Sequence, residues 1–259
     1  MCEIREVQPQ DPAVLLEAEH AVARVLAQGV VLPRVYPRLL EAMGTALHWD
    51  VAAAWDVGDD GTMACVATWA ADGVDSERFE GATRVLRLGR GEGLPGRVWR
   101  LGRPARIADL AADANFPRAA SARAAGLCCA LALPVRGARG VIGAIVLFAR
   151  RQIASDRALI QTMASLGRQI GQAIERARAE VALRDSIARK SAILDAAFDC
   201  VITMDGEGRV VEVNRTTERT FGYRADDMVG RDLADLIIPP ELRALHRRGG
   251  GRSRRARSR

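Results

Sequence analysis

The stretch GRGEGLPG at residues 89–96 is the pattern in this 259-residue chain that most directly suggests a chemical function. It contains GxGxxG at 91–96, a spacing that in dinucleotide-binding proteins lets backbone N–H groups approach a pyrophosphate at a helix N-terminus. Such a site also requires a buried strand before the glycines and a long helix after them. Here the preceding residues alternate between apolar and basic, Pro95 removes one N–H donor, and Gly-Arg-Pro at 102–104 stops the helix early. We therefore expect a structural loop instead of a nucleotide site.

The nucleophilic and metal-ligating residues do not form a catalytic or metal-binding set. The five cysteines and three histidines are scattered, and no second cysteine pair accompanies Cys128 and Cys129 to complete a zinc site. Neighbouring residues on a strand point to opposite faces, so we interpret these two cysteines as small buried residues, with a redox pair as the alternative. We predict neither a metal centre nor enzymatic activity in this chain.

The net charge of +6 comes from the C-terminal tail. Residues 247–259, RRGGGRSRRARSR, contain seven arginines and no acidic residue, and the rest of the chain is close to neutral. The tail could bind nucleic acid or anionic lipid by charge alone, but we interpret it as disordered, with no specific nucleic-acid partner. No apolar run approaches the length of a membrane span, and the N-terminus lacks the apolar centre of a signal peptide. We expect a cytoplasmic protein without a membrane partner.

Hydrophobic periodicity predicts a mixed set of helices and strands. Apolar residues repeat at helical spacing before residue 50 and after residue 156, whereas the middle of the chain contains short apolar runs separated by turn residues. The runs at 127–135 and 141–149 are apolar on both faces and are joined by RGARG, so we expect a hairpin in the middle of a sheet that is covered on both sides. The predicted elements are helices at 13–28, at 35–47 and from 156 onward, and strands at 50–57, 62–70, 83–89, 127–135 and 141–149.

The long helix after residue 156 carries a regular apolar stripe. Leu166, Ile170, Ile174 and Val181 recur at steps of four and seven residues, which is typical of a coiled-coil seam. The alternative is an amphipathic helix that lies on its own domain. We expect both: the first turns pack on the sheet, and the remainder forms a homodimer with a second copy.

The motifs that follow the glycine-rich segment resemble, in order, the second half of a GAF domain. A short helix is followed by a Gly-x-Pro turn at 102–104 and a strand that ends in Asp109. An Asn-Phe-Pro corner at 115–117, a strand that ends at Pro134 and a hairpin come next. The resemblance covers residues 13–175.

GAF domains are small-molecule sensors or dimerisation modules, so the resemblance implies a ligand-binding role. The candidate ligand contacts are Trp55, Trp99, Asp109 and Phe116. The tryptophans, Trp69 included, could instead belong to the core, and Asp109 could instead hold the following loop through backbone N–H groups. No cysteine has the neighbouring histidine of a phytochrome-type bilin site, and the residue set of cyclic-nucleotide GAF domains is missing. The ligand is unknown, and a domain without a ligand is the alternative.

The segment C-terminal to the long helix resembles the front half of a PAS domain. It has Asp-Gly between two predicted strands at 200–205 and 210–214, an Asn that closes the second strand, and Phe-Gly-Tyr with a Gly seven residues later. We interpret Asp205 as a turn former and Asn214 as a strand-ending cap. His246 falls in the helix where haem-binding PAS sensors carry their iron ligand, so it is the candidate haem ligand. Many PAS domains without haem also have a histidine there, and we do not expect haem.

The predicted fold is α+β: a GAF-type antiparallel sheet flanked by helices, a long helical linker, a truncated PAS-type α/β half-domain and a disordered Arg-rich tail. We expect a sensory module, the N-terminal sensor part of a histidine kinase of a two-component system, without a catalytic domain in this chain. The alternatives are the sensor region of a diguanylate cyclase or transcriptional regulator, or a free-standing dimeric ligand-binding module. The predicted boundaries are an N-terminal segment at 1–12, the GAF-like domain at 13–175, the coiled-coil linker at 176–191, the incomplete PAS-like domain at 192–248 and the basic tail at 249–259.

Overall fold

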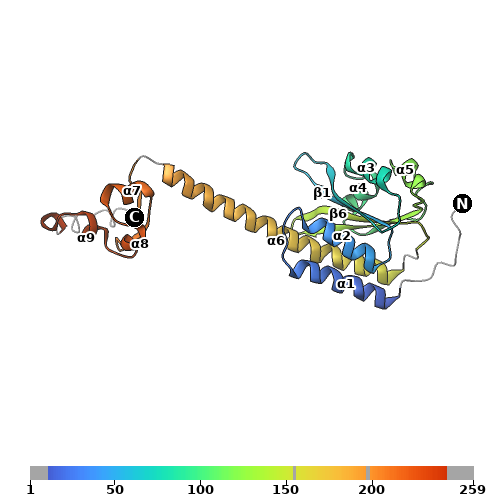
Figure 1. Cartoon of the computed structure of the whole chain (residues 1–259), viewed down its shortest axis with the longest axis horizontal. Coiled ribbons are helices and arrows are strands. Elements are labelled where there is room, and N and C mark those ends of the chain that lie inside the picture. Colours follow the sequence, from blue (N-terminus) through green and yellow to red (C-terminus); the bar gives the residue numbers. More distant parts are fainter. Residues whose placement is uncertain (1–10, 154–155, 197–198, 244–259) are drawn as a thin grey trace, which may run out of the picture. The chain divides into compact units, whose positions relative to one another are not determined.

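The computed structural model describes residues 11–153, 156–196 and 199–243 (Figure 1). The chain divides into two compact units, Met1–Glu180 and Val181–Arg259. The candidate haem ligand His246 and the Arg-rich tail lie outside the described residues.

The first unit is built on a six-stranded sheet in which neighbouring strands are antiparallel, in the order β3-β2-β1-β6-β5-β4. Strands β1 and β6 occupy the centre, and β5 and β6 are buried over most of their length. The predicted interior hairpin is therefore confirmed. The strands are β1 (Val51–Val57), β2 (Met63–Ala70), β3 (Arg87–Leu88), β4 (Ala105–Ile107), β5 (Cys129–Gly137) and β6 (Gly140–Ala149).

Helices cover both faces of this sheet, as Figure 1 shows. One face packs against α1 (Pro12–Ala27), α2 (Val35–Ala46) and the first part of α6 (Arg157–Ala196). The other face is covered by shorter helices, α3 (Glu77–Arg84), α4 (Gly93–Leu101) and α5 (Ala119–Ala124). The sheet thus separates two apolar cores, in agreement with the predicted sheet that is covered on both sides.

The alternation of side chains along each strand divides the two cores. On β1, Ala52 and Ala54 face the long helices, whereas Val51, Ala53 and Trp55 face the short ones. The residues that face the long helices on β5 and β6 are mostly large, and those that face the short helices include several alanines: Ala53, Ala130, Ala132 and Ala144. Small residues on the second face leave room there for large side chains that come from the helices and loops.

The prediction of a strand at 83–89 is wrong for most of its length. Residues up to Arg84 belong to helix α3, and only Arg87–Leu88 pair with β2. The alternation of apolar and basic residues favoured a strand, yet Val85 is 78% exposed. The apolar anchor of this segment is Phe79, which is buried one turn before the predicted strand begins.

Helix α6 spans 40 residues, and its first half is part of the core of the first unit. Leu166, Ile170 and Ile174 are fully buried against the sheet, which corrects their assignment to a dimer seam: their apolar surface is already covered within the chain. Val181, the fourth residue of that stripe, is 52% exposed. In the described parts of the chain, no helix has the length and apolar character needed to cross a membrane.

The second unit is small in its described part. A two-stranded antiparallel hairpin, β7 (Ile202–Met204) with β8 (Val210–Val213), is followed by α7 (Arg215–Phe221), α8 (Ala225–Met228) and α9 (Leu233–Ile237). The predicted roles of Asp205 as a turn former and of Asn214 as a cap are both confirmed. Asp205 accepts hydrogen bonds from the N–H groups of the turn at Glu207 and Arg209, and Asn214 caps α7 by accepting from Thr217 N.

Candidate functional site

The glycine-rich loop at 89–96 uses its backbone donors within the chain. The N–H of Gly89 donates to the Glu92 carboxylate at 2.7 Å, Gly91 N donates to Gly96 O at 2.8 Å, and Gly93 N donates to Asn115 Oδ1 at 2.9 Å. A Cβ at Gly96 would lie 2.3 Å from Gly89 O, so glycine is required there for the close turn itself. These contacts agree with the predicted structural loop, since the donors of a phosphate cradle already have acceptors.

Beneath α3 and α5, four aromatic side chains surround one arginine. The guanidinium carbon of Arg118 lies 5.0 to 5.4 Å from the ring centres of Trp55, Phe79, Phe116 and Phe148. We call these five residues the Arg118 cluster. Each such cation–π contact contributes about 0.5–2 kcal/mol, with the larger values for desolvated pairs. The rings also contact each other. Phe79 packs edge-on against Phe148, with 4.9 Å between the ring centres.

The cluster is assembled from segments far apart in the sequence. Trp55 and Phe148 project from the two central strands, and Phe79 comes from α3. Phe116 and Arg118 lie in the segment just before α5, and Arg118 is the residue that precedes its first turn. The alanines on this face of the sheet provide the space that the rings and the guanidinium occupy.

Arg118 is a buried cation without an acidic partner in the described residues. It is 3% exposed, its Nη1 donates to Thr83 Oγ1 at 2.6 Å, and its Nε has no hydrogen-bond partner. Burial lowers the pKa of Arg118 to about 10, so the side chain is still charged at neutral pH. A buried charge that is balanced only by rings and one hydroxyl is costly, which makes Arg118 a candidate functional residue.

Of the predicted ligand contacts, the structure brings two together. Trp55 and Phe116 both belong to the Arg118 cluster, and Trp99 packs half-buried at the border of the same apolar core. Asp109 is exposed and accepts a hydrogen bond from Ala111 N at 2.8 Å, which confirms the alternative that it holds the following loop. Sequence reasoning missed Arg118, because nothing in NFPRAASARAAG marks one arginine as buried.

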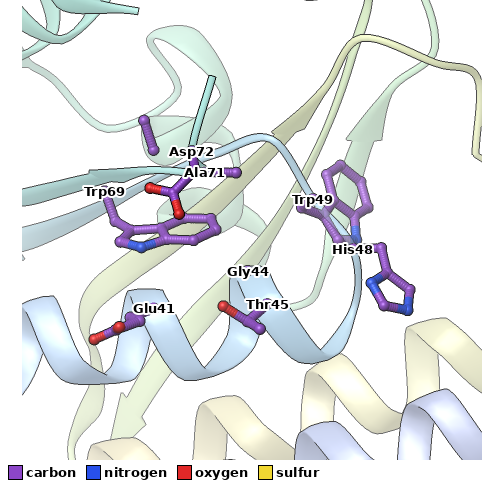
Figure 2. A pocket seen from close by; sticks show the side chains of 9 residues that line it. Glu41, Gly44, Thr45, His48, Trp49, Trp69, Ala71 and Asp72 are labelled. Carbon is purple, nitrogen blue, oxygen red and sulfur yellow. The ribbon is translucent and has the colours of Figure 1, made fainter. Parts of the chain in front are cut away.

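A separate pocket of about 350 Å³ lies between α2 and the end of β2 (Figure 2). The Trp69 ring lies over α2 at Gly44, where a Cβ would approach the ring to 2.0 Å. Trp69 lines this pocket, which is open. The pocket lies on the other side of the sheet from the Arg118 cluster. The lining residues are Glu41, Gly44, Thr45, His48, Trp49, Trp69, Ala70, Ala71 and Asp72.

The thiols near the cores are poorly suited to redox chemistry. Burial raises the pKa of Cys129 and of Cys65, which keeps both thiols protonated at neutral pH. Cys129 is fully buried and its Sγ donates to Arg151 O at 3.2 Å. The interpretation of Cys129 as a small core residue agrees with these contacts.

A polar junction connects α6 to the sheet near the end of the first unit. Arg178 Nη2 on α6 donates to Asp56 Oδ2 at 2.6 Å, and the Tyr36 hydroxyl on α2 donates to Asp56 Oδ1 at 2.6 Å. Burial and the Asp56 carboxylate raise the pKa of Tyr36 well above its ordinary value, so the phenol remains a donor. One turn earlier, Glu175 accepts from Ala138 N in the β5–β6 turn at 2.7 Å.

Two glycines let α6 approach the hairpin closely before this junction. A Cβ at Gly167 would lie 2.2 Å from Pro134 O, and a Cβ at Gly171 would lie 2.1 Å from Arg136 O. Helix backbone therefore rests directly on strand backbone. A displacement of the hairpin must move α6 with it, since no side-chain layer separates them.

A six-stranded antiparallel sheet, with long helices on one face and short helices over the Arg118 cluster on the other, defines an α+β domain. The chain belongs to the GAF domain family, whose pattern matches residues 32–175, and the PAS fold matches residues 188–252. These matches confirm the prediction of a GAF domain followed by a PAS region.

Solved structures share the fold at low sequence identity. The GAF domain of a phosphoenolpyruvate-protein phosphotransferase from Coxiella burnetii is 19% identical, with a TM-score of 0.52 over 65% of this chain and 98% of that chain. A free methionine-R-sulfoxide reductase from Neisseria meningitidis is 11% identical, with a TM-score of 0.53 over 68% of this chain and 99% of that chain. These similarities establish the fold alone.

Among curated proteins, the cell-division control histidine kinase PdhS of Brucella anthropi is 33% identical over 72 residues, which is 28% of this chain. The chain spans only 7% to 9% of the length of the curated relatives it matches.

Proposed function

We propose that this chain is the sensory region of a larger signalling protein, in which the state of the GAF domain is passed to the PAS region through α6. The observation that carries the proposal is the junction of Arg178 with Asp56 and Tyr36. It joins α6 to the central strand β1 and to α2 close to residue 180, where the first unit ends. A helix fixed in this way follows any change in the sheet.

The proposed route of the signal begins at the sheet. Trp55 in the Arg118 cluster and Asp56 in the junction are neighbours on β1 and point to opposite faces. A shift of β1 caused by a change around Trp55 would therefore also move Asp56 and its hydrogen-bonded Arg178. A single peptide bond, between Trp55 and Asp56, connects the cluster to the junction.

We further propose that the larger protein is a histidine kinase of a two-component system. The support is the sequence similarity to PdhS, a cell-division control histidine kinase. A diguanylate cyclase or a transcriptional regulator with the same sensory region is the alternative. In this proposal the chain itself performs no catalysis, and no group of three or more metal-ligating side chains is found in the part of the chain that the structure describes.

The output activity can be tested on the native protein. An antibody raised against residues 11–180 would isolate it from its own cells, and the purified material would be assayed for autophosphorylation with ATP and for cyclic dinucleotide synthesis with GTP. We expect acid-labile phosphorylation of a histidine. Synthesis of a cyclic dinucleotide without autophosphorylation would contradict the kinase assignment.

We also propose that the chain forms a homodimer through the part of α6 beyond the first unit. Leu183 and Ile187 lie four residues apart on one face of the helix and are 62% and 60% exposed. Val181 lies on a different face, so the contact surface differs from the predicted seam. Changing Leu183 and Ile187 to Lys should abolish self-association in sedimentation experiments. Ile170→Lys should unfold the first unit instead, and a wild-type monomer at about 100 μM would contradict the dimer.

A further inference from the structure

We propose that the Arg118 cluster binds a small organic carboxylate, with the carboxylate held by Arg118 and the apolar body held by the surrounding rings. The inference rests on the proposed sensory function, because it names the class of ligand that the GAF domain would detect.

The charge of the cluster favours an anion. The guanidinium of Arg118 is 3% exposed and has no acidic partner within 4 Å among the described residues, and its contacts are the Thr83 hydroxyl and four ring faces. Arginine presents its donors in a planar fork that matches the two oxygens of a carboxylate. An anion would supply the opposite charge that the protein itself does not place there.

The unpaired donors of the cluster favour a ligand with several hydrogen-bond acceptors. Nε of Arg118 and Nε1 of Trp55 are both buried without a hydrogen-bond partner. The two residues are in direct contact, since the guanidinium carbon lies 5.3 Å from the Trp55 ring centre. A carboxylate accepts several hydrogen bonds and could satisfy both donors, whereas a cation or a purely apolar ligand could satisfy neither.

The surroundings favour a ligand with a flat apolar body. Phe79, Phe116 and Phe148 provide aromatic surface on several sides of the guanidinium, and the alanines of the sheet add small apolar contacts. Aromatic carboxylates combine the two properties, so benzoate is a suitable probe. Benzamide has nearly the same shape without the charge, and it is the matched control.

Binding would have to move the covering segments. The rings and Arg118 already touch each other, so a ligand can enter only if Phe79 and Thr83 on α3, or Phe116 and Arg118 before α5, separate from the sheet. These covering segments are outside the sheet, whereas Trp55 and Phe148 are within its central strands. Ligand entry would therefore change the position of α3 and α5 relative to β1.

The experiment titrates the full chain with formate, acetate, succinate and benzoate at constant ionic strength. Calorimetry and thermal unfolding would report binding, with benzamide as the neutral control. We expect saturable binding of at least one carboxylate and at least tenfold weaker binding of benzamide than of benzoate. Arg118→Gln should weaken carboxylate binding at least tenfold, because it removes charge-assisted hydrogen bonds. Arg123→Gln, an exposed arginine of α5, should leave it unchanged.

A second variant keeps the test decisive if Arg118→Gln fails to fold. Trp55→Phe retains an aromatic ring but removes the unpaired indole donor, and it should weaken benzoate binding. The proposal is overturned if no carboxylate of the panel binds the wild type, if benzamide binds as tightly as benzoate, or if a folded Arg118→Gln variant binds as well as the wild type. None of these results would overturn the junction at Arg178, which is tested by separate variants.

Discussion

Arg178 of α6 and Asp56 at the end of β1 form an ion pair with a nitrogen–oxygen distance of 2.6 Å, although they lie 122 residues apart in the sequence. The same carboxylate accepts the hydroxyl proton of Tyr36, so one acidic group joins two helices and the central sheet. The pair is only partly exposed, with 38% of the Arg178 side chain and 23% of the Asp56 side chain accessible.

Arg178→Gln should loosen the attachment of α6. We expect a loss of about 1 kcal/mol in the free energy of unfolding, the range of partly exposed ion pairs, and faster hydrogen exchange around residues 172–182. The matched control is Arg176→Gln, because Arg176 pairs with Glu180 on the exposed side of the same helix, at 83% and 55% exposure. Equal effects of the two variants in urea unfolding and exchange would contradict a special role for Arg178.

Gly171→Ala should be strongly destabilising. The new Cβ would lie 2.1 Å from Arg136 O, so α6 must move away from β5, at a cost of about 2 kcal/mol or more. Gly81→Ala is the opposite case, since Gly81 lies within α3 with nothing near its added Cβ. That variant should gain about 0.5–1 kcal/mol from helix propensity. Chemical denaturation measures both, and a stable Gly171→Ala variant would contradict the direct backbone contact.

Asp113→Asn should reduce stability in a pH-dependent way. The hydrogen bond from Arg97 holds the pKa of Asp113 below its ordinary value of 3.8. A carboxyl whose pKa is lower in the folded state stabilises the fold above that ordinary value, and the contribution disappears as the pH falls through the folded pKa. We therefore expect wild type to exceed the variant by about 1 kcal/mol at pH 7. The difference should shrink as the pH falls below this ordinary value and through the lowered pKa of the folded state. Unfolding curves at several pH values test this, and a difference independent of pH would contradict it.

The PAS region should be the less stable unit. The apolar cluster of its described part contains three buried side chains, Val210, Met228 and Leu236, while Val211 on the same hairpin is 53% exposed. Burial of three such side chains provides about 5–9 kcal/mol before the cost of ordering the backbone, and an isolated two-stranded hairpin is marginal in water. We expect fast exchange at 202–213 and slow exchange at 129–149. Equal protection of the two hairpins would contradict this ranking.

Elements whose apolar pattern is long and regular could be predicted from the sequence. The helix predicted at 13–28 is found as α1, and its apolar residues Leu15, Ala18, Val22 and Val25 are buried. The same kind of pattern could not reveal what covers it. Leu166, Ile170 and Ile174 fit a coiled coil and a sheet-packed helix equally well, and only the tertiary structure shows that the sheet covers them.

The candidate site was predictable in its apolar part alone. Trp55 and Phe116 are large apolar residues, and such residues are expected in pockets or cores. Arg118 has no local sequence signal, because arginine is usually exposed and this chain contains many. Its burial follows from Ala53, Ala130, Ala132 and Ala144, which leave space on one face of the sheet, and that relation exists only after the strands have paired.

Hydrogen exchange on the full chain, with and without benzoate, tests most directly the claim that the GAF domain passes its ligand state to α6. We predict altered exchange in α3 and α5 (77–84 and 119–124) together with altered exchange in α6 at 172–182, and loss of the α6 response in Arg178→Gln. Saturable benzoate binding that changes α3 and α5 but leaves α6 unaltered in the wild type would contradict the claim.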